Sequence, residues 1–99
     1  MGNSNSLTSQ EVKKSIGKFD LILDVRTQDE WNDGHYPSAI HIPIDRLDKK
    51  FSKIYPDKNF HILIYCKSGN RASKAQSILD GLGYKNVYYL LDDGYSSLL

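Results

Sequence analysis

Cysteine is nearly absent from this chain, which contains only Cys66 in 99 residues. A lone cysteine cannot form a disulfide within its own chain. The three histidines, His35, His41 and His61, are scattered and show no spacing that would place them with Cys66 around a zinc ion. We therefore expect no internal disulfide, no metal site and no bound cofactor.

The sequence also lacks an excess of charge and any long apolar run. The chain contains thirteen Lys and Arg residues and twelve Asp and Glu residues, which gives a net charge of +1. This balance does not indicate a nucleic-acid surface, and no apolar stretch approaches the length of a membrane-spanning helix. No basic and apolar start typical of a signal peptide is visible either. We expect a cytoplasmic protein with neither nucleic-acid nor membrane partners.

The first six residues are small and mostly polar after Met1. They fit the short pattern for myristoylation of Gly2, which requires a serine or threonine at the sixth position. The simpler interpretation is a flexible tail over residues 1–6, followed by one domain over residues 7–99. This length supports one hydrophobic core but not two.

Strand and helix patterns alternate along the rest of the chain. Two capping boxes, Thr8 to Glu11 and Thr27 to Glu30, predict short helices that end near Gly17 and Gly34. Apolar runs predict strands over residues 19–25, 39–42, 60–65 and 87–91. Further helices are expected over residues 47–54, capped by Asp45, over residues 72–82, followed by Gly83 as C-cap, and over residues 93–99. The alternation predicts an α/β fold with a central, mostly parallel β-sheet and helices on both faces.

The strongest candidate for chemistry is the segment that begins at Cys66 and ends at Arg71. Cys66 leaves the most apolar predicted strand, at the sheet edge where α/β proteins bind ligands. Lys67 and Arg71 supply positive charge, Gly69 allows a tight turn, and the helix that follows directs free N–H groups toward the loop. Cations and a helix N-terminus stabilise a thiolate. We expect Cys66 to be a nucleophile rather than a small buried core residue.

No general base stands next to this cysteine in the sequence. His61 lies within a predicted strand, and structural roles are expected for His35 and His41. Acyl transfer normally needs a positioned histidine, whereas transfer of a sulfane sulfur from thiosulfate does not, because sulfite departs as a stable anion. Sulfur transfer requires a thiolate, cations that recognise the donor, and N–H groups that stabilise a persulfide. The loop has candidates for all three.

Five segments, in their order along the chain, resemble the signatures of the rhodanese-like domain. They are Asp24-Val25-Arg26 with Glu30-Trp31, Gly34 to Pro43, Tyr65 to Ser73, Gly83 to Val87, and Leu91 to Tyr95. The resemblance covers about residues 7 to 99. It implies a rhodanese-like fold and a sulfurtransferase that works through a persulfide on Cys66.

The resemblance also implies roles for the loop residues. A cradle of backbone N–H groups that binds the substrate would be formed by residues 67 to 71, which are Lys67, Ser68, Gly69, Asn70 and Arg71. Arg71 would orient the oxyanion of the donor. The partners would be a small anionic donor, such as thiosulfate, a polysulfide or a persulfide, and a thiol, cyanide or a sulfur-carrier protein as acceptor. We expect Arg26 and Glu30 to form a structural ion pair.

Three other functions fit parts of the same pattern. A phosphatase or arsenate reductase of this fold also uses a cysteine and an arginine, but a phosphatase loop holds five residues between them and this one holds four. A non-catalytic binding or regulatory module often lacks the cysteine that is present here. A redox sensor would need a second cysteine to resolve a sulfenic acid.

Overall fold

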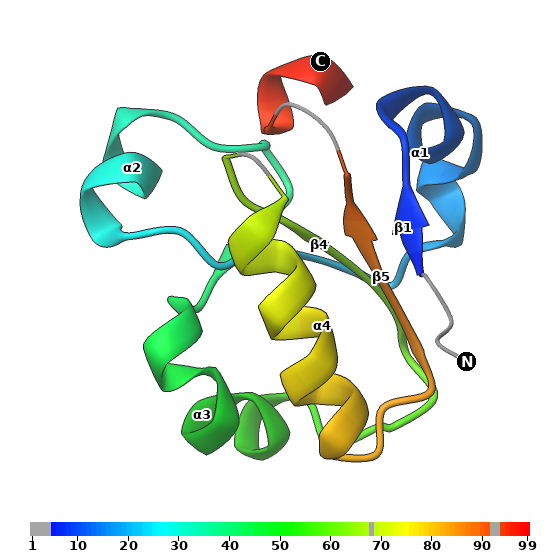
Figure 1. Cartoon of the computed structure of the whole chain (residues 1–99), viewed down its shortest axis with the longest axis vertical. Helices are drawn as coiled ribbons and strands as arrows, with labels where there is room; N and C mark the ends of the chain where they lie inside the picture. The colour runs from blue at the N-terminus through cyan, green and yellow to red at the C-terminus, as the bar shows by residue number, and fades with distance from the viewer. Residues whose placement is uncertain (1–4, 68, 92–93) are drawn as a thin grey trace.

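The computed structural model describes residues 5–67, 69–91 and 94–99. Its centre is a five-stranded sheet in which every pair of neighbouring strands is parallel, in the order β1-β5-β4-β2-β3 (Figure 1). The strands are β1 (Ser6–Leu7), β2 (Leu21–Asp24), β3 (Ile40–His41), β4 (His61–Tyr65) and β5 (Asn86–Leu90). The predicted parallel sheet is therefore confirmed.

Helices connect the strands. They are α1 (Ser9–Ser15), α2 (Gln28–Asp33), α3 (Leu47–Ile54) and α4 (Asn70–Gly81), with short 3-10 segments η1 (Ile16–Lys18), η2 (Ile44–Arg46) and η3 (Tyr95–Leu98). None of the helices within the described ranges has the length and apolar character that crossing a membrane requires.

Two apolar clusters cover the two faces of the sheet. Successive residues of β4 alternate between them, as the two-residue period of a strand requires: Ile62 and Ile64 join one cluster, Leu63 and Tyr65 the other. The first cluster includes buried side chains of α3 and α4, the helix that crosses in front of the sheet in Figure 1. The second includes Val12 of α1 together with residues of η3. Helices thus cover both faces, as predicted.

The two capping boxes are confirmed, whereas the C-cap of α4 is Leu82 and not the predicted Gly83. In both α1 and α2 the threonine before the helix accepts a hydrogen bond from the third helical residue, whose glutamate side chain bonds back to the threonine N–H. Gly34 ends α2. Gly83 follows α4 with a φ of 98°, in the left-handed region that favours glycine at this position.

Two predictions about element boundaries were wrong. Asp45 does not cap α3, because the 3-10 segment η2 precedes that helix and places Arg46 at the cap position, without a side-chain hydrogen bond. The expected final helix is only the 3-10 segment that begins at Tyr95, and the predicted start at Asp93 lies outside the described residues.

The end of the predicted flexible tail takes part in the sheet. Ser6 pairs with Tyr89 of β5, and the Asn5 side-chain amide donates to the carbonyl oxygen of Val87 at 2.8 Å. Residues 1–4 lie outside the described part of the chain. A two-residue edge strand carries too little pattern to be recognised in a sequence.

Candidate active site

The loop that follows β4 turns tightly at Gly69. This glycine precedes α4 with φ 92° and ψ −21°, in the left-handed region. A Cβ atom here would lie 2.7 Å from the carbonyl oxygen of Leu91, just after the neighbouring strand β5. Because the obstructing atom belongs to the backbone, it cannot move aside as a flexible side chain could. Glycine is therefore required at this turn, which brings the loop back to Cys66.

The sulfur of Cys66 is held by backbone N–H groups. Its Sγ accepts hydrogen bonds from the N–H of Gly69 at 3.1 Å and from the N–H of Ala72 at 3.3 Å. The residue is only 2% exposed. Both donors lie at the start of α4, where N–H groups have no partner within the helix. Such donors stabilise negative charge on the sulfur.

Gly69 was among the predicted loop residues, whereas Ala72 was not. Its contribution comes from the backbone, so its side chain carried no signal. Its position in the first turn of the helix that follows the cysteine could have identified it. Among the other predicted residues, Lys67 and Asn70 are exposed, and Ser68 lies outside the described residues. Lys67 lines a cavity of about 210 Å³ together with Glu30 and Tyr95.

Arg71 forms a two-point ion pair with Glu30 of α2. Its two terminal nitrogens donate to the two carboxylate oxygens at 2.7 and 3.0 Å. The predicted pair between Arg26 and Glu30 is therefore wrong. Glu30 lies in the first turn of α2 and reaches the first turn of α4 instead. Among the described residues, the other three of the five N–H donors of this guanidinium have no hydrogen-bond partner.

The charges of this pair stabilise each other. Hydrogen bonds from Arg71 lower the pKa of Glu30 from 4.5 to about 2, against the opposing effect of burial. Hydrogen bonds to Glu30 raise the pKa of Arg71, and negative charge on Cys66 acts in the same direction. Arg71 is thus a permanent cation within electrostatic reach of the sulfur.

Replacing Glu30 with glutamine should lower the free energy of unfolding at pH 7 by about 1–2 kcal/mol, since solvent partly screens a pair with side-chain exposures of 32% and 28%. Glutamine can still serve in the capping box, so the change isolates the ion pair. The folded-state pKa lies below the unfolded one. The stabilisation is therefore complete above pH 4.5 and disappears as the pH falls toward 2.

Urea unfolding of both proteins at several pH values would measure this difference. Glu11→Gln is the matched control, because Glu11 occupies the same capping-box position in α1 and its hydrogen bonds there are to Thr8. It should change stability little at any pH. A Glu30→Gln effect that stays constant from pH 7 to pH 2 would contradict the proposed contribution of the ion pair.

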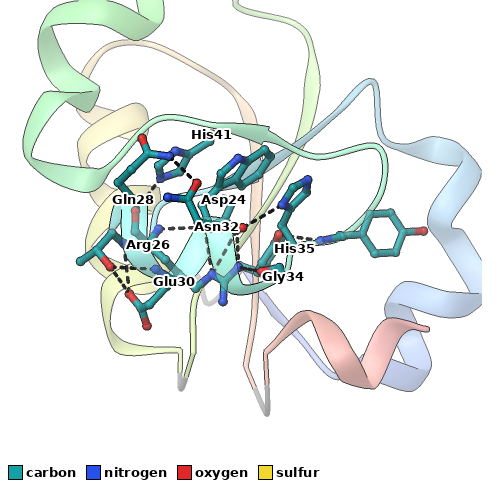
Figure 2. A network of polar contacts seen from close by, with 12 residues as sticks. Asp24, Arg26, Gln28, Glu30, Asn32, Gly34, His35 and His41 are labelled. Atoms are coloured by element: carbon teal, nitrogen blue, oxygen red, sulfur yellow. Dashed lines mark hydrogen bonds and ion pairs between the residues drawn. The ribbon is translucent and has the colours of Figure 1, made fainter.

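A buried ion pair supports the loop before α2. Arg26 donates from its backbone N–H, its Nε and one terminal nitrogen to Asp24, whose side chain is fully buried (Figure 2). The same guanidinium donates to the carbonyl oxygen of Gly34 at 2.6 Å. It lies over the rings of Tyr65 and Tyr95, 5.5 and 5.1 Å from their centroids. Arg26 therefore connects the end of β2 with the end of α2.

The three histidines contact neighbouring side chains and carbonyl oxygens. The rings of His35 and His41 stack on Trp31, with centroids 3.4 and 4.9 Å apart. His35 also contacts the carbonyl oxygen of Trp31, and His41 contacts that of Arg26. His61 is half-exposed, 3.7 Å from Asp20. Within residues 5–67, 69–91 and 94–99, no histidine makes a hydrogen bond to Cys66.

The sequence profile of the rhodanese-like domain matches residues 8–99. A putative mitochondrial thiosulfate sulfurtransferase of Schizosaccharomyces pombe is 33% identical over 81 residues, which cover 71% of this chain. Thiosulfate sulfurtransferase PspE of Escherichia coli is 32% identical over 65 residues, which cover 66% of it. The matched regions span 57% and 62% of the length of these two relatives.

A solved structure extends the similarity to three dimensions. The rhodanese-related protein from Thermoplasma volcanium superposes with a TM-score of 0.80 at 29% identity. The superposition covers 95% of this chain and 89% of the other.

Proposed function

Because the chain belongs to the rhodanese-like domain family, we propose that it is a sulfurtransferase that carries a sulfane sulfur as a persulfide on Cys66. The observation that supports this most directly is the environment of Cys66. Two N–H groups are directed at its sulfur, and the cation Arg71 lies next to one of these donors in the chain. A thiolate and its persulfide anion are both stabilised by such donors.

In the first step the thiolate of Cys66 attacks the outer sulfur of an anionic donor such as thiosulfate. A bond forms between the two sulfur atoms, and the bond from the outer sulfur to the sulfonate sulfur breaks. Sulfite leaves with that electron pair, so no proton transfer is needed. In the second step cyanide or a thiolate attacks the terminal sulfur, and the electron pair of the persulfide bond returns to Cys66. Two such half-reactions give ping-pong kinetics.

The experiment that tests the proposal is the intact mass of the protein before and after thiosulfate, and again after cyanide. We expect a gain of one sulfur atom that cyanide reverses. No gain with thiosulfate, polysulfide or glutathione persulfide would overturn the proposal. We place the reaction in a reducing compartment such as the cytoplasm, where Cys66 stays available as a thiol.

Arg71 is the residue that we expect to recognise the donor. Arg71→Ala should lower kcat/KM for thiosulfate about 100-fold, because it removes the partly buried cation that we expect to bind the donor anion. Lys67→Ala should cost a few-fold at most, because Lys67 is exposed and its charge is screened by solvent. Steady-state kinetics with thiosulfate and cyanide would measure both effects.

Arg71→Ala also leaves the carboxylate of Glu30 without its partner. The double variant Glu30→Gln/Arg71→Ala removes that leftover negative charge and should remain at least tenfold impaired if the guanidinium itself binds the donor. Recovery of full activity in the double variant would mean that the single variant fails through repulsion by Glu30. Equal, small losses for Arg71→Ala and Lys67→Ala would show that neither charge recognises the donor.

A further inference from the structure

A cavity of about 370 Å³ opens beside Arg71. Its walls come from the residues that follow β2, from η2 and from the first turn of α4. This volume lies in the range of small-molecule sites and is much larger than a thiosulfate ion requires. The cavity therefore has room for a larger reactant of the same site.

The cavity borders the helix turn that holds the sulfur of Cys66. Arg71 lines it, and the next residue in the chain, Ala72, donates its N–H to Cys66. Val25 also lines it and belongs to the same apolar cluster as Cys66. Cys66 does not line the cavity; the first turn of α4 connects the two, because it contributes Arg71 to the wall and the Ala72 N–H to the sulfur.

Two residues of opposite charge that are neighbours in the chain line the cavity. Arg46 and Asp45, both exposed and both on η2, line the cavity. Across the described ranges, neither side chain is within ion-pair distance of an oppositely charged group. The other two cations of the wall, Arg26 and Arg71, each hold a carboxylate partner, Asp24 and Glu30 respectively. Arg46 and Asp45 are thus the two charged groups of the described wall that have no partner of opposite charge.

Apolar and polar groups complete the wall. Pro43 and Ile44 add apolar surface beside Val25, and Gln28 adds an amide. A ligand that matches this surface has a short apolar stem and a head that carries a carboxylate next to an ammonium group. An α-amino acid has that pair of charges on one carbon atom.

We propose that this cavity binds the sulfur acceptor, a small thiol that carries an α-amino acid group, with its carboxylate on Arg46 and its ammonium on Asp45. The inference rests on the proposed function and names the acceptor class for the same site. The acceptor thiol loses its proton to solvent, and its thiolate attacks the terminal sulfur of the Cys66 persulfide. A new S–S bond forms on the acceptor, and the Cys66 thiolate leaves with the electron pair of the broken bond.

Four acceptor thiols distinguish the contribution of Arg46 from that of Asp45. Cysteine carries both groups, 3-mercaptopropionate only the carboxylate, cysteamine only the amine, and 2-mercaptoethanol neither. Protein persulfidated with thiosulfate is discharged with each of them, and kcat/KM is compared between variant and wild type for the same thiol. This ratio cancels the different intrinsic reactivities of the thiols.

For Arg46→Gln we expect kcat/KM to fall about tenfold with cysteine and 3-mercaptopropionate, relative to the change with 2-mercaptoethanol. For Asp45→Asn the same loss should appear with cysteine and cysteamine instead. Arg46→Lys should recover part of the activity with the carboxylated thiols. Lys49→Gln is the matched control, an exposed cation of α3 outside the cavity lining, and should alter none of the four.

Equal changes with all four thiols would overturn the inference, as would no change in either variant. If the inference fails in this way but 2-mercaptoethanol still discharges the persulfide, the proposed sulfur transfer through Cys66 is unaffected. Failure of the wild-type protein to take up sulfur at all would end both proposals.

Discussion

Replacing Cys66 with alanine should abolish sulfur transfer. We expect the variant to gain no mass with thiosulfate and to lose at least about 10³-fold in kcat with thiosulfate and cyanide, because every turnover passes through this sulfur. The chain has no other cysteine, so no second thiol can take over. Intact mass and thiocyanate formation would measure the two losses.

The Cys66→Ala variant must be shown to fold, because an unfolded protein would also be inactive. Cys66 is buried, and its removal leaves a small void beside α4. Far-ultraviolet circular dichroism and urea unfolding would establish that the domain is intact. Ser77→Ala, an exposed position on the same helix, is the matched control and should retain full activity. Substantial turnover by a folded Cys66→Ala protein would refute the persulfide route.

The second large effect concerns stability. Replacing Asp24 with asparagine should lower the free energy of unfolding by about 3–5 kcal/mol, because Arg26 would remain as a buried charge without its counterion. The side chain of Asp24 is fully buried and that of Arg26 is 9% exposed. Domains of this size have total stabilities of about 5–15 kcal/mol, so a large fraction would be lost.

Urea unfolding would measure this loss, and Asp20→Asn is its control. Asp20 also lies near a basic side chain, His61, but both are about half-exposed, so the change should cost less than about 1 kcal/mol. The double variant Asp24→Asn/Arg26→Met should recover part of the loss, since it removes the unpaired charge. Equal effects of Asp24→Asn and Asp20→Asn would contradict the role assigned to the buried pair.

The partners of Arg26 and Glu30 were not predicted correctly from the sequence. Arg26 and Glu30 are close in the chain, which made their pairing the natural prediction. In the structure Arg26 turns back to Asp24, two residues before it, and Glu30 pairs with Arg71, 41 residues away. The second pairing depends on how α2 and α4 lie against each other, and no local pattern encodes that.

Local signals, in contrast, predicted local structure well. Each capping box closes within three residues of its own chain, and the longer elements, α3, α4, β4 and β5, follow from their apolar side chains. There were three exceptions. β1 is too short to show a period, a 3-10 turn places Arg46 rather than Asp45 at the cap of α3, and the expected final helix is only the 3-10 segment that begins at Tyr95.

The single cysteine and the order of the motifs selected Cys66 and the loop that follows it as the candidate site, and the sequence correctly predicted the strand, the glycine turn and the helix start around it. The partner of Arg71 and the cavity that Arg71 shares with Arg46 depended on tertiary structure. Their residues come from segments far apart in the chain, and only the packing of the sheet and its helices brings those segments together.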